Sequence, residues 1–293
     1  GNLNQIFYTI CGSTAVETAL KICIAYHKAR GHGQRFRFVG RERAYHGMNI
    51  GATSVGGMIN NVKTFANILM PGVVHMRHTH LPEHKFVKGQ PETGADLAND
   101  LERIALNFGA ENIAACIVEP ISGSTGTLVP PKGYLNRLRE ICDKHDILLI
   151  FDEVITGWGR TGSSFASKEY GVTPDLITMA KATTNGIVPM GVVAVKEEIY
   201  DTIVNASPDG VIELFHGYTY SGIPVAVAAA LAVQDIFEKE DIFNRAKELA
   251  PYFQEGLFSL KDIDVVDNIR GYGMMGGIDI KTDGRPGKAG LAT

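Results

Sequence analysis

The stretch ILLIFDEVITGWGRTG, residues 147–162, decides the fold class of this 293-residue chain. It opens with a continuous apolar run of strand length, and Asp152 follows that run directly. A continuous run, unlike an alternating one, is typical of a strand covered on both faces, as in a parallel α/β sheet. Ligands of such sheets bind at the carboxyl ends of strands, so Asp152 is placed to meet one. The ordinary alternative for a single carboxylate is a helix cap or a surface acid.

The sequence on both sides alternates in the same way between apolar runs and helical patterns. Strand-like runs occupy residues 6–10, 36–40, 114–118, 176–180 and 191–195. Helical patterns lie between these runs and after the last of them. The pattern at residues 224–238 is apolar enough that we expect a largely buried helix. Alternation of this kind predicts an α/β fold, with a mostly parallel sheet flanked by helices.

The pattern changes near residue 241, where a charged amphipathic helix and two short strand-like runs follow. We therefore predict a large domain at residues 1–240 and the beginning of a small α+β domain at residues 241–293. The chain starts directly on a strand-like run and stops after a Gly-rich turn, so we interpret it as a fragment, with the large domain incomplete at its N-terminus and the small domain truncated.

A second strand end carries a lysine. In DLITMAKATTNG, residues 175–186, Lys181 follows an apolar run 29 residues after Asp152. An isolated lysine there usually extends to solvent. A lysine and an aspartate facing one crevice suit pyridoxal phosphate, because the lysine amine can bind the cofactor aldehyde and the acid keeps the pyridine nitrogen protonated.

Two further segments could complete such a site. Gly12 and Ser13 join a strand to a helix start, whose free backbone N–H groups and positive dipole end suit a phosphate; a plain capped helix is an equal alternative, and Thr14 with Glu17 has the spacing of a capping box. In RAYHGMN, Tyr45 and His46 follow the run at residues 36–40, and an aromatic ring there can stack on a planar cofactor or simply pack.

Composition argues against several classes of protein. The formal net charge of −4 gives no sign of the basic surface that nucleic acid requires. Four cysteines occur without a CxxC pair, and no run of about 18 apolar residues appears. We expect a cytoplasmic protein with free thiols, and neither nucleic acid nor membrane as a partner.

These segments together resemble the class III (subgroup II, fold-type I) pyridoxal-phosphate-dependent aminotransferases, and especially their omega-amino acid:pyruvate, or β-alanine:pyruvate, branch. The matching stretches occur in family order over nearly the whole chain: CGSTAVETALK, GRERAYHGMNIGATSVGG, VEPISGSTGTLVPPKGYLNRLREICDKHDILLIFDEVITGWGRTG, PDLITMAKATTNGIVPMG and FHGYTYSGIPVA. The resemblance implies transamination from an omega-amino acid or amine to pyruvate, with pyridoxamine phosphate as the intermediate form of the cofactor. Another amine or diamine aminotransferase of class III is the alternative.

The resemblance also implies roles for particular residues. Lys181 becomes the Schiff-base lysine and Asp152 the partner of the pyridinium nitrogen. The other implied cofactor-binding residues are Gly12 and Ser13 for the phosphate, Tyr45 and Val154 for the two ring faces, His46 beside Tyr45, and Glu119 near Asp152. Thr219 is implied to reach the phosphate of the neighbouring subunit's cofactor, which makes the active unit a homodimer or a dimer of dimers.

The chain departs from the family pattern at a few positions. Ile10 and Cys11 precede Gly12 where the family usually has a polar residue and serine, and Ile223 stands where histidine is common. Ser124 occupies the place of the glutamate found in the ornithine and γ-aminobutyrate branches, which favours the pyruvate branch. The resemblance assigns the substrate-carboxylate arginine to segments that this chain lacks.

Other functions remain as alternatives. Residues 157–162, GWGRTG, match the GxGxxG pattern of nicotinamide dehydrogenases, but DEVIT separates them from the strand and no acid follows at the expected distance. The cluster His75, His78, His80 and His84 invites a zinc site, yet its spacing matches no standard ligand set, so we expect no metal. A non-catalytic binding protein, or a truncated product that cannot assemble its pocket, is the third class.

Overall fold

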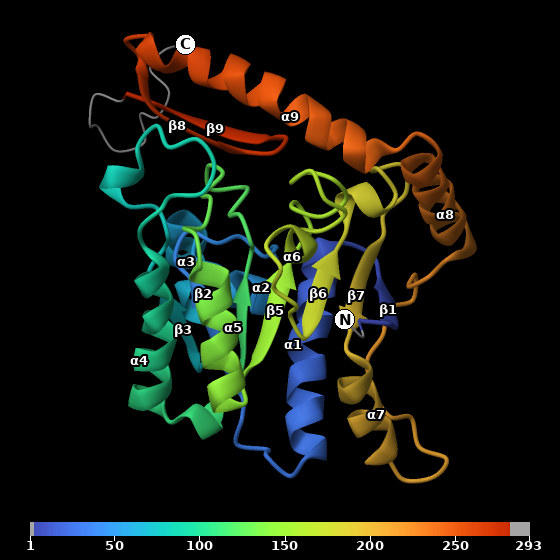
Figure 1. The fold of residues 1–293 in the computed structure, drawn as a ribbon. Coiled ribbons are helices and arrows are strands. Elements are labelled where there is room, and N and C mark those ends of the chain that lie inside the picture. Colours follow the sequence, from blue (N-terminus) through green and yellow to red (C-terminus); the bar gives the residue numbers. More distant parts are fainter. Residues whose placement is uncertain (1–2, 282–293) are drawn as a thin grey trace.

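The computed structural model describes residues 3–281. Its centre is a seven-stranded sheet of order β1-β7-β6-β5-β4-β2-β3 (Figure 1). The strands are β1 Gln5–Thr9, β2 Arg37–Arg41, β3 Val73–Met76, β4 Ile113–Val118, β5 Leu148–Asp152, β6 Leu176–Met179 and β7 Gly191–Val195. Only β7 runs against its neighbours; all other pairs are parallel. The carboxyl ends of β1, β2, β4, β5 and β6 therefore meet at one edge, and the predicted mostly parallel sheet is confirmed.

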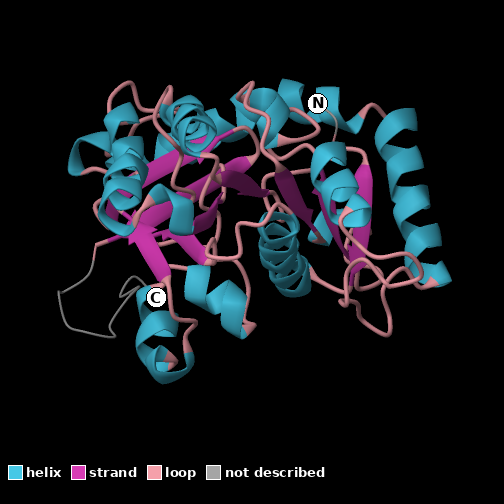
Figure 2. Ribbon diagram, turned by 90° about the horizontal axis from the view of Figure 1, so that it is seen from below, coloured by secondary structure: helices cyan, strands magenta, loops and turns pink. Residues whose placement is uncertain are grey.

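Helices cover both faces of this sheet (Figure 2). They are α1 Gly12–Ala29, α2 Ile50–Val55, α3 Ile59–Thr64, α4 Asn99–Phe108, α5 Tyr134–His145, α6 Ala166–Glu169, α7 Glu197–Asn205, α8 Pro224–Lys239 and α9 Ile242–Phe258. Leu148 and Ile150 of β5 belong to the core under α1 and α7, whereas Leu149 and Phe151 belong to the core under α4 and α5. The alternating side chains of β5 thus fill two cores, which is why its sequence is continuously apolar.

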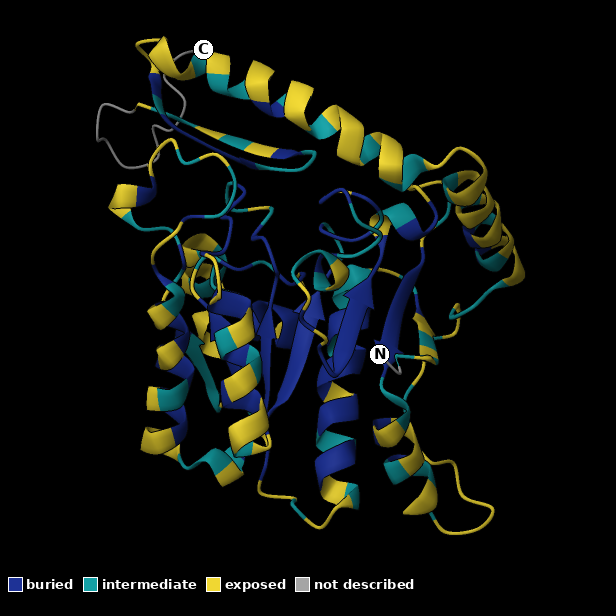
Figure 3. Cartoon of the chain, in the orientation of Figure 1, coloured by how far each residue is buried: buried dark blue, intermediate teal, exposed yellow. Residues whose placement is uncertain are grey.

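The prediction that the apolar helix at residues 224–238 is largely buried is wrong. Only Ala226 and Ala230 of α8 are buried, while Val225 is 59% and Leu231 60% exposed. The helix lies beyond the β1 end of the sheet and presents much of its apolar surface to solvent (Figure 3). The apolar composition of a helix indicates that its surface favours burial. Actual burial also requires a neighbouring element that covers the helix, and within residues 3–281 α8 has such a neighbour only along the side of Ala226 and Ala230.

The C-terminal part contains the elements that the sequence indicates. Helix α9 is followed by β8 Val266–Tyr272 and β9 Met275–Ile280, which form a separate two-stranded antiparallel sheet. These elements lie together at the top of Figure 1. The division into domains at residue 240 stays a prediction, and residues 282–293 of the proposed small domain lie outside the described residues. Within residues 3–281, no helix is long and apolar enough to cross a membrane.

Candidate active site

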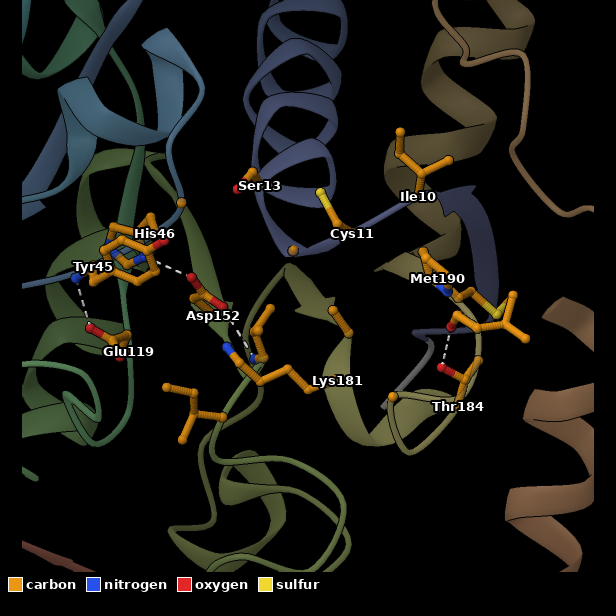
Figure 4. Close-up of a pocket in the computed structure, with 18 residues that line it drawn as sticks. Ile10, Cys11, Ser13, Tyr45, His46, Glu119, Asp152, Lys181, Thr184 and Met190 are labelled. Atoms are coloured by element: carbon orange, nitrogen blue, oxygen red, sulfur yellow. Dashed lines mark hydrogen bonds and ion pairs between the residues drawn. The ribbon is translucent and has the colours of Figure 1, made fainter.

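A cavity of about 300 Å³ opens at the carboxyl edge of the sheet (Figure 4). This volume is at the lower end of the range for ligand pockets, roughly 300–1,000 Å³. Eight of the nine residues singled out from the sequence line it: Gly12, Ser13, Tyr45, His46, Glu119, Asp152, Val154 and Lys181. They come from segments spread over 170 residues, and the parallel strands bring them to one place because the segments all follow carboxyl strand ends.

Asp152 is the last residue of β5 and is 3% exposed. One carboxylate oxygen, Oδ2, lies 2.8 Å from Nδ1 of His46. The other, Oδ1, accepts the N–H of Val154 at 3.1 Å and the hydroxyl of Thr178 at 3.1 Å. These three groups fix the orientation of the carboxylate, and His46 donates to it from Nδ1.

Glu119 follows β4 and connects two segments of the cavity wall. Its Oε1 accepts the N–H of Tyr45 at 2.9 Å, and its Oε2 accepts the N–H of Gly123 at 3.0 Å. Burial raises the pKa of Glu119; the nearby His46 opposes this rise and Asp152 adds to it. Glu119 therefore holds the backbone beside Tyr45 against the turn at Gly123.

Lys181 lies in a short turn after β6 and has a φ of +46°. This left-handed conformation is unfavourable for a residue with a side chain, and such strain is concentrated at functional sites. Within residues 3–281 the amine makes no hydrogen bond or ion pair. Lys181 also lines a second cavity of about 690 Å³. Its side chain extends toward Asp152 in the first cavity, as Figure 4 shows.

Helix α1 begins at Gly12, directly after β1. The predicted capping box of Thr14 and Glu17 is wrong, because the helix starts before Thr14. Oγ1 of Thr14 instead accepts the N–H of Cys11 at 3.0 Å, and Oε1 of Glu17 accepts the N–H of Ala52 at 2.8 Å. The N–H groups of the first turn therefore face the cavity end of α1, where an anion is favoured.

A side chain at position 12 would crowd Val154. A Cβ added to Gly12 would lie 3.1 Å from both methyl carbons of Val154. The contact would narrow the space between the start of α1 and the segment after β5. Ile10 and Cys11, the two departures from the family pattern, also line the cavity. Ile223 lies apart from it, as the residue before α8.

Thr219 is the one predicted site residue that does not line the cavity. It is exposed in the loop between α7 and α8. Its proposed contact with a neighbouring subunit stays a prediction.

The rival motifs do not form the sites that they suggest. Residues 157–162 form turns after β5, and the helix that follows, α6, has four residues and starts only at Ala166. His75 donates from Nε2 to the carbonyl of Gly56 at 2.8 Å, and Nε2 of His80 lies 3.3 Å from Nδ2 of Asn268. Among residues 3–281, no group of three or more His, Cys, Asp or Glu side chains is placed to hold a metal ion.

Glu153 was missed by the sequence reasoning, although it directly follows Asp152. It is completely buried, and its Oε2 accepts the N–H of Ala166 at 2.6 Å while its Oε1 accepts the N–H of Ser167 at 2.8 Å. Burial raises the pKa of Glu153, and these N–H groups oppose the rise. The residue fastens the far end of the 154–165 segment to β5. The sequence did hold a signal for this role, because Glu153 is a second acid beside Asp152 within an otherwise apolar stretch.

We expect Glu153→Ala to lower the free energy of unfolding by about 2–4 kcal/mol, because the buried N–H of Ala166 and the partly buried N–H of Ser167 lose their acceptor and a void remains. Chemical denaturation of the variant and the wild type measures this difference. Glu140→Ala is the matched control, since Glu140 is on the surface of α5 and its side chain is 63% exposed. Equal stability of the Glu153 variant and the control would contradict a structural role for Glu153.

Known proteins provide three comparisons. The family model described as aminotransferase class-III matches residues 1–290. The chain is 55% identical to an omega-aminotransferase of Caulobacter vibrioides over 97% of the chain and 64% of that protein. It is 48% identical to a beta-alanine–pyruvate aminotransferase of Pseudomonas aeruginosa over 99% of the chain and 66% of that protein. The solved omega transaminase of Pseudomonas jessenii in complex with PMP has a TM-score of 0.87 and 34% identity, over 94% of this chain and 61% of that one. The chain thus spans about 64–66% of the length of these curated relatives.

Proposed function

Because this chain belongs to the class-III aminotransferase family, we propose that it is part of a pyridoxal-phosphate-dependent transaminase that moves an amino group from an omega-amino acid or amine to pyruvate. The observation that carries the proposal is the placement of Lys181 and Asp152 on one cavity, at the ends of the neighbouring strands β6 and β5. The names of the relatives support the choice of amino donor and acceptor.

The cavity walls fit the cofactor in three respects. The first turn of α1 offers backbone N–H groups at Gly12 and Ser13 for a phosphate. Asp152, oriented as an acceptor by His46, can bind a protonated ring nitrogen. Tyr45 and Val154 line the same space and are available for the two faces of the ring. Lys181 would hold the aldehyde end through its amine.

When bound, pyridoxal phosphate supplies an aldehyde that combines with amines and a protonated ring that accepts negative charge. Asp152 would keep the proton on the ring nitrogen, because a buried carboxylate beside a protonated nitrogen favours the charged form of that nitrogen. Lys181 would anchor the cofactor through Nζ, and the same amine would serve as the base that takes a proton from the reacting carbon of the amino donor. Lys181 has the left-handed backbone conformation noted above, and its side chain lines the cavity.

The second cavity gives room for the amino donor. It shares Lys181 and Val154 with the cofactor cavity, and Ser124 lines it. The ornithine and γ-aminobutyrate branches are implied to carry a glutamate at this position. Serine is smaller and uncharged, so the cavity here is wider and carries no negative charge from this side chain. This difference supports the pyruvate branch. A different amine or diamine donor of the same family is the second candidate.

The assembly is proposed to be a homodimer or a dimer of dimers, with Thr219 reaching the neighbouring site. Large apolar side chains near Thr219 are exposed in the single chain, with Phe215 at 81% and Tyr220 at 67%. Exposed apolar residues of this size are enriched at protein interfaces. The cellular compartment stays a prediction.

Reduction with borohydride tests the cofactor assignment in the full-length protein. We expect a yellow protein that is bleached by the reagent and carries the added mass of the reduced cofactor on the peptide containing Lys181. A panel of omega-amino acids, amines and diamines, each with pyruvate, then tests the donor. A colourless protein that borohydride leaves unmodified would refute the proposed cofactor, and transfer from no donor to pyruvate would refute the proposed acceptor.

A further inference from the structure

The loop that carries Thr219, residues 212–223, contacts α1 through His216 and Tyr218. The imidazole stacks on Phe7 of β1, with ring centroids 5.5 Å apart and planes 18° apart. Tyr218 packs against its edge at 5.1 Å. We refer to residues 212–223 as the Thr219 loop.

Hydrogen bonds fix both the position and the tautomer of His216. Nζ of Lys21 lies 3.3 Å from Nδ1, and an ammonium group can only donate, so Nδ1 is the acceptor. Nε2 therefore carries the proton and donates to Oγ1 of Thr18 at 2.7 Å. The hydroxyl of Thr18 in turn donates to the carbonyl of Thr14 at 2.8 Å. This arrangement requires a neutral imidazole.

The same contacts lead to the start of α1. Oγ1 of Thr14 accepts the N–H groups of Cys11 at 3.0 Å and Ile10 at 3.2 Å. The hydroxyl of Tyr218 also donates to the carbonyl of Thr14, at 3.4 Å. The Thr219 loop is thus connected to the first turn of the helix whose end is proposed to bind phosphate.

We infer that His216 is a positioning residue: its neutral imidazole latches the Thr219 loop onto α1 and so holds Thr219 for the phosphate of the neighbouring subunit's cofactor, while protonation of the ring releases the loop. The inference rests on the proposed function, because it needs a phosphate-bearing cofactor and a second subunit. The latch itself rests on contacts within one chain.

The pH dependence has a definite sign. The groups facing the imidazole are Lys21 on α1, Tyr218 in the loop and the uncharged Phe7 on β1. Burial lowers the pKa of His216, and the charge of Lys21 lowers it further. A released ring binds a proton more readily than a latched one, so the latch is at full strength above the ordinary histidine pKa of about 6.5 and weakens as the pH falls through it.

The test measures the dissociation constant of pyridoxal 5′-phosphate for the full-length protein at pH 8. Thr219→Ala should raise this dissociation constant roughly tenfold to a hundredfold, because one hydrogen bond to the phosphate is lost. His216→Ala should raise the constant within the same range, and the His216→Ala/Thr219→Ala double variant should match Thr219→Ala alone. Additive effects would show that His216 acts independently of Thr219 and would overturn the inference.

A pH series on the same variants tests the release. The dissociation constant of the wild type should rise between pH 8 and pH 5.5 more than that of His216→Gln, whose amide does not titrate. Lys21→Met should move the midpoint of this difference to higher pH, because a cation beside the ring is lost. Lys28→Met removes an exposed charge from the other end of α1 and should leave the midpoint unchanged. Identical pH profiles of the wild type and His216→Gln would overturn the inference.

The outcomes separate the inference from the function on which it rests. If Thr219→Ala binds the cofactor like the wild type, the proposed role of the loop fails and the latch fails with it. If Thr219→Ala weakens binding and His216→Ala does not, only the latch fails. Thermal melting of each apoprotein checks that the variants are folded. His216 is only partly buried, so we expect its replacement to leave the core packed.

Discussion

Lys181→Ala is expected to abolish transamination in the full-length protein while leaving it folded. Proton transfer by a positioned side chain contributes roughly 10²–10⁴-fold to a rate, and loss of the covalent anchor adds to this. The side chain is exposed and makes no hydrogen bond within residues 3–281, so its removal should hardly change the free energy of unfolding. Steady-state assays with pyruvate as acceptor measure the activity, and thermal melting measures the stability.

Lys168→Ala is the control for this substitution, since Lys168 lies in α6 outside the proposed cofactor cavity. It should retain the activity of the wild type. Retention of most of the activity by Lys181→Ala would mean that another amine performs the chemistry. Addition of a small primary amine gives a further check, because such amines can replace a missing lysine as proton carrier.

Asp152→Asn is expected to lower turnover by several orders of magnitude with little loss of fold. The amide has nearly the shape of the carboxylate and can still accept from Val154 and Thr178 through its oxygen, while its NH₂ group can donate to His46 in the other tautomer. What it lacks is the negative charge that holds the proton on the ring nitrogen. The effect should therefore fall on the rate rather than on stability.

The assay for Asp152→Asn compares turnover with the melting temperature of the variant loaded with cofactor. Asp235→Asn, an exposed carboxylate on α8, is the control and should behave as the wild type. A mild effect of Asp152→Asn on turnover, together with a large loss of stability, would assign Asp152 a structural role and refute its proposed part in the chemistry.

Much of the fold follows from local pattern. The continuous apolar runs predicted the main strands to within one or two residues, because a strand buried on both faces has no polar positions to alternate with. The same pattern placed Asp152 and Lys181 at strand ends. It did not reveal that β7 runs antiparallel to its neighbours, since direction depends on how connections cross the sheet rather than on composition.

Other features depend on residues far apart in the sequence. The spacing of Thr14 and Glu17 allows a capping box, but α1 begins at Gly12 and Glu17 instead accepts the N–H of Ala52, 35 residues away. The role of Glu153 depends on the N–H groups of Ala166 and Ser167, which only the folded segment brings to it. Sequence spacing shows which groups can pair locally, but it does not show which partner is nearest after folding.

The sequence by itself thus determined the mostly parallel α/β class and placed Lys181 and Asp152 at strand ends, because both follow from short-range periodicity and from the geometry common to parallel sheets. Only the tertiary structure decided that α8 is exposed, that Glu153 is buried and that His216 joins the Thr219 loop to α1. Burial and the partners of a polar group are set by packing across the whole chain, and that packing exists only once the strands and helices have come together.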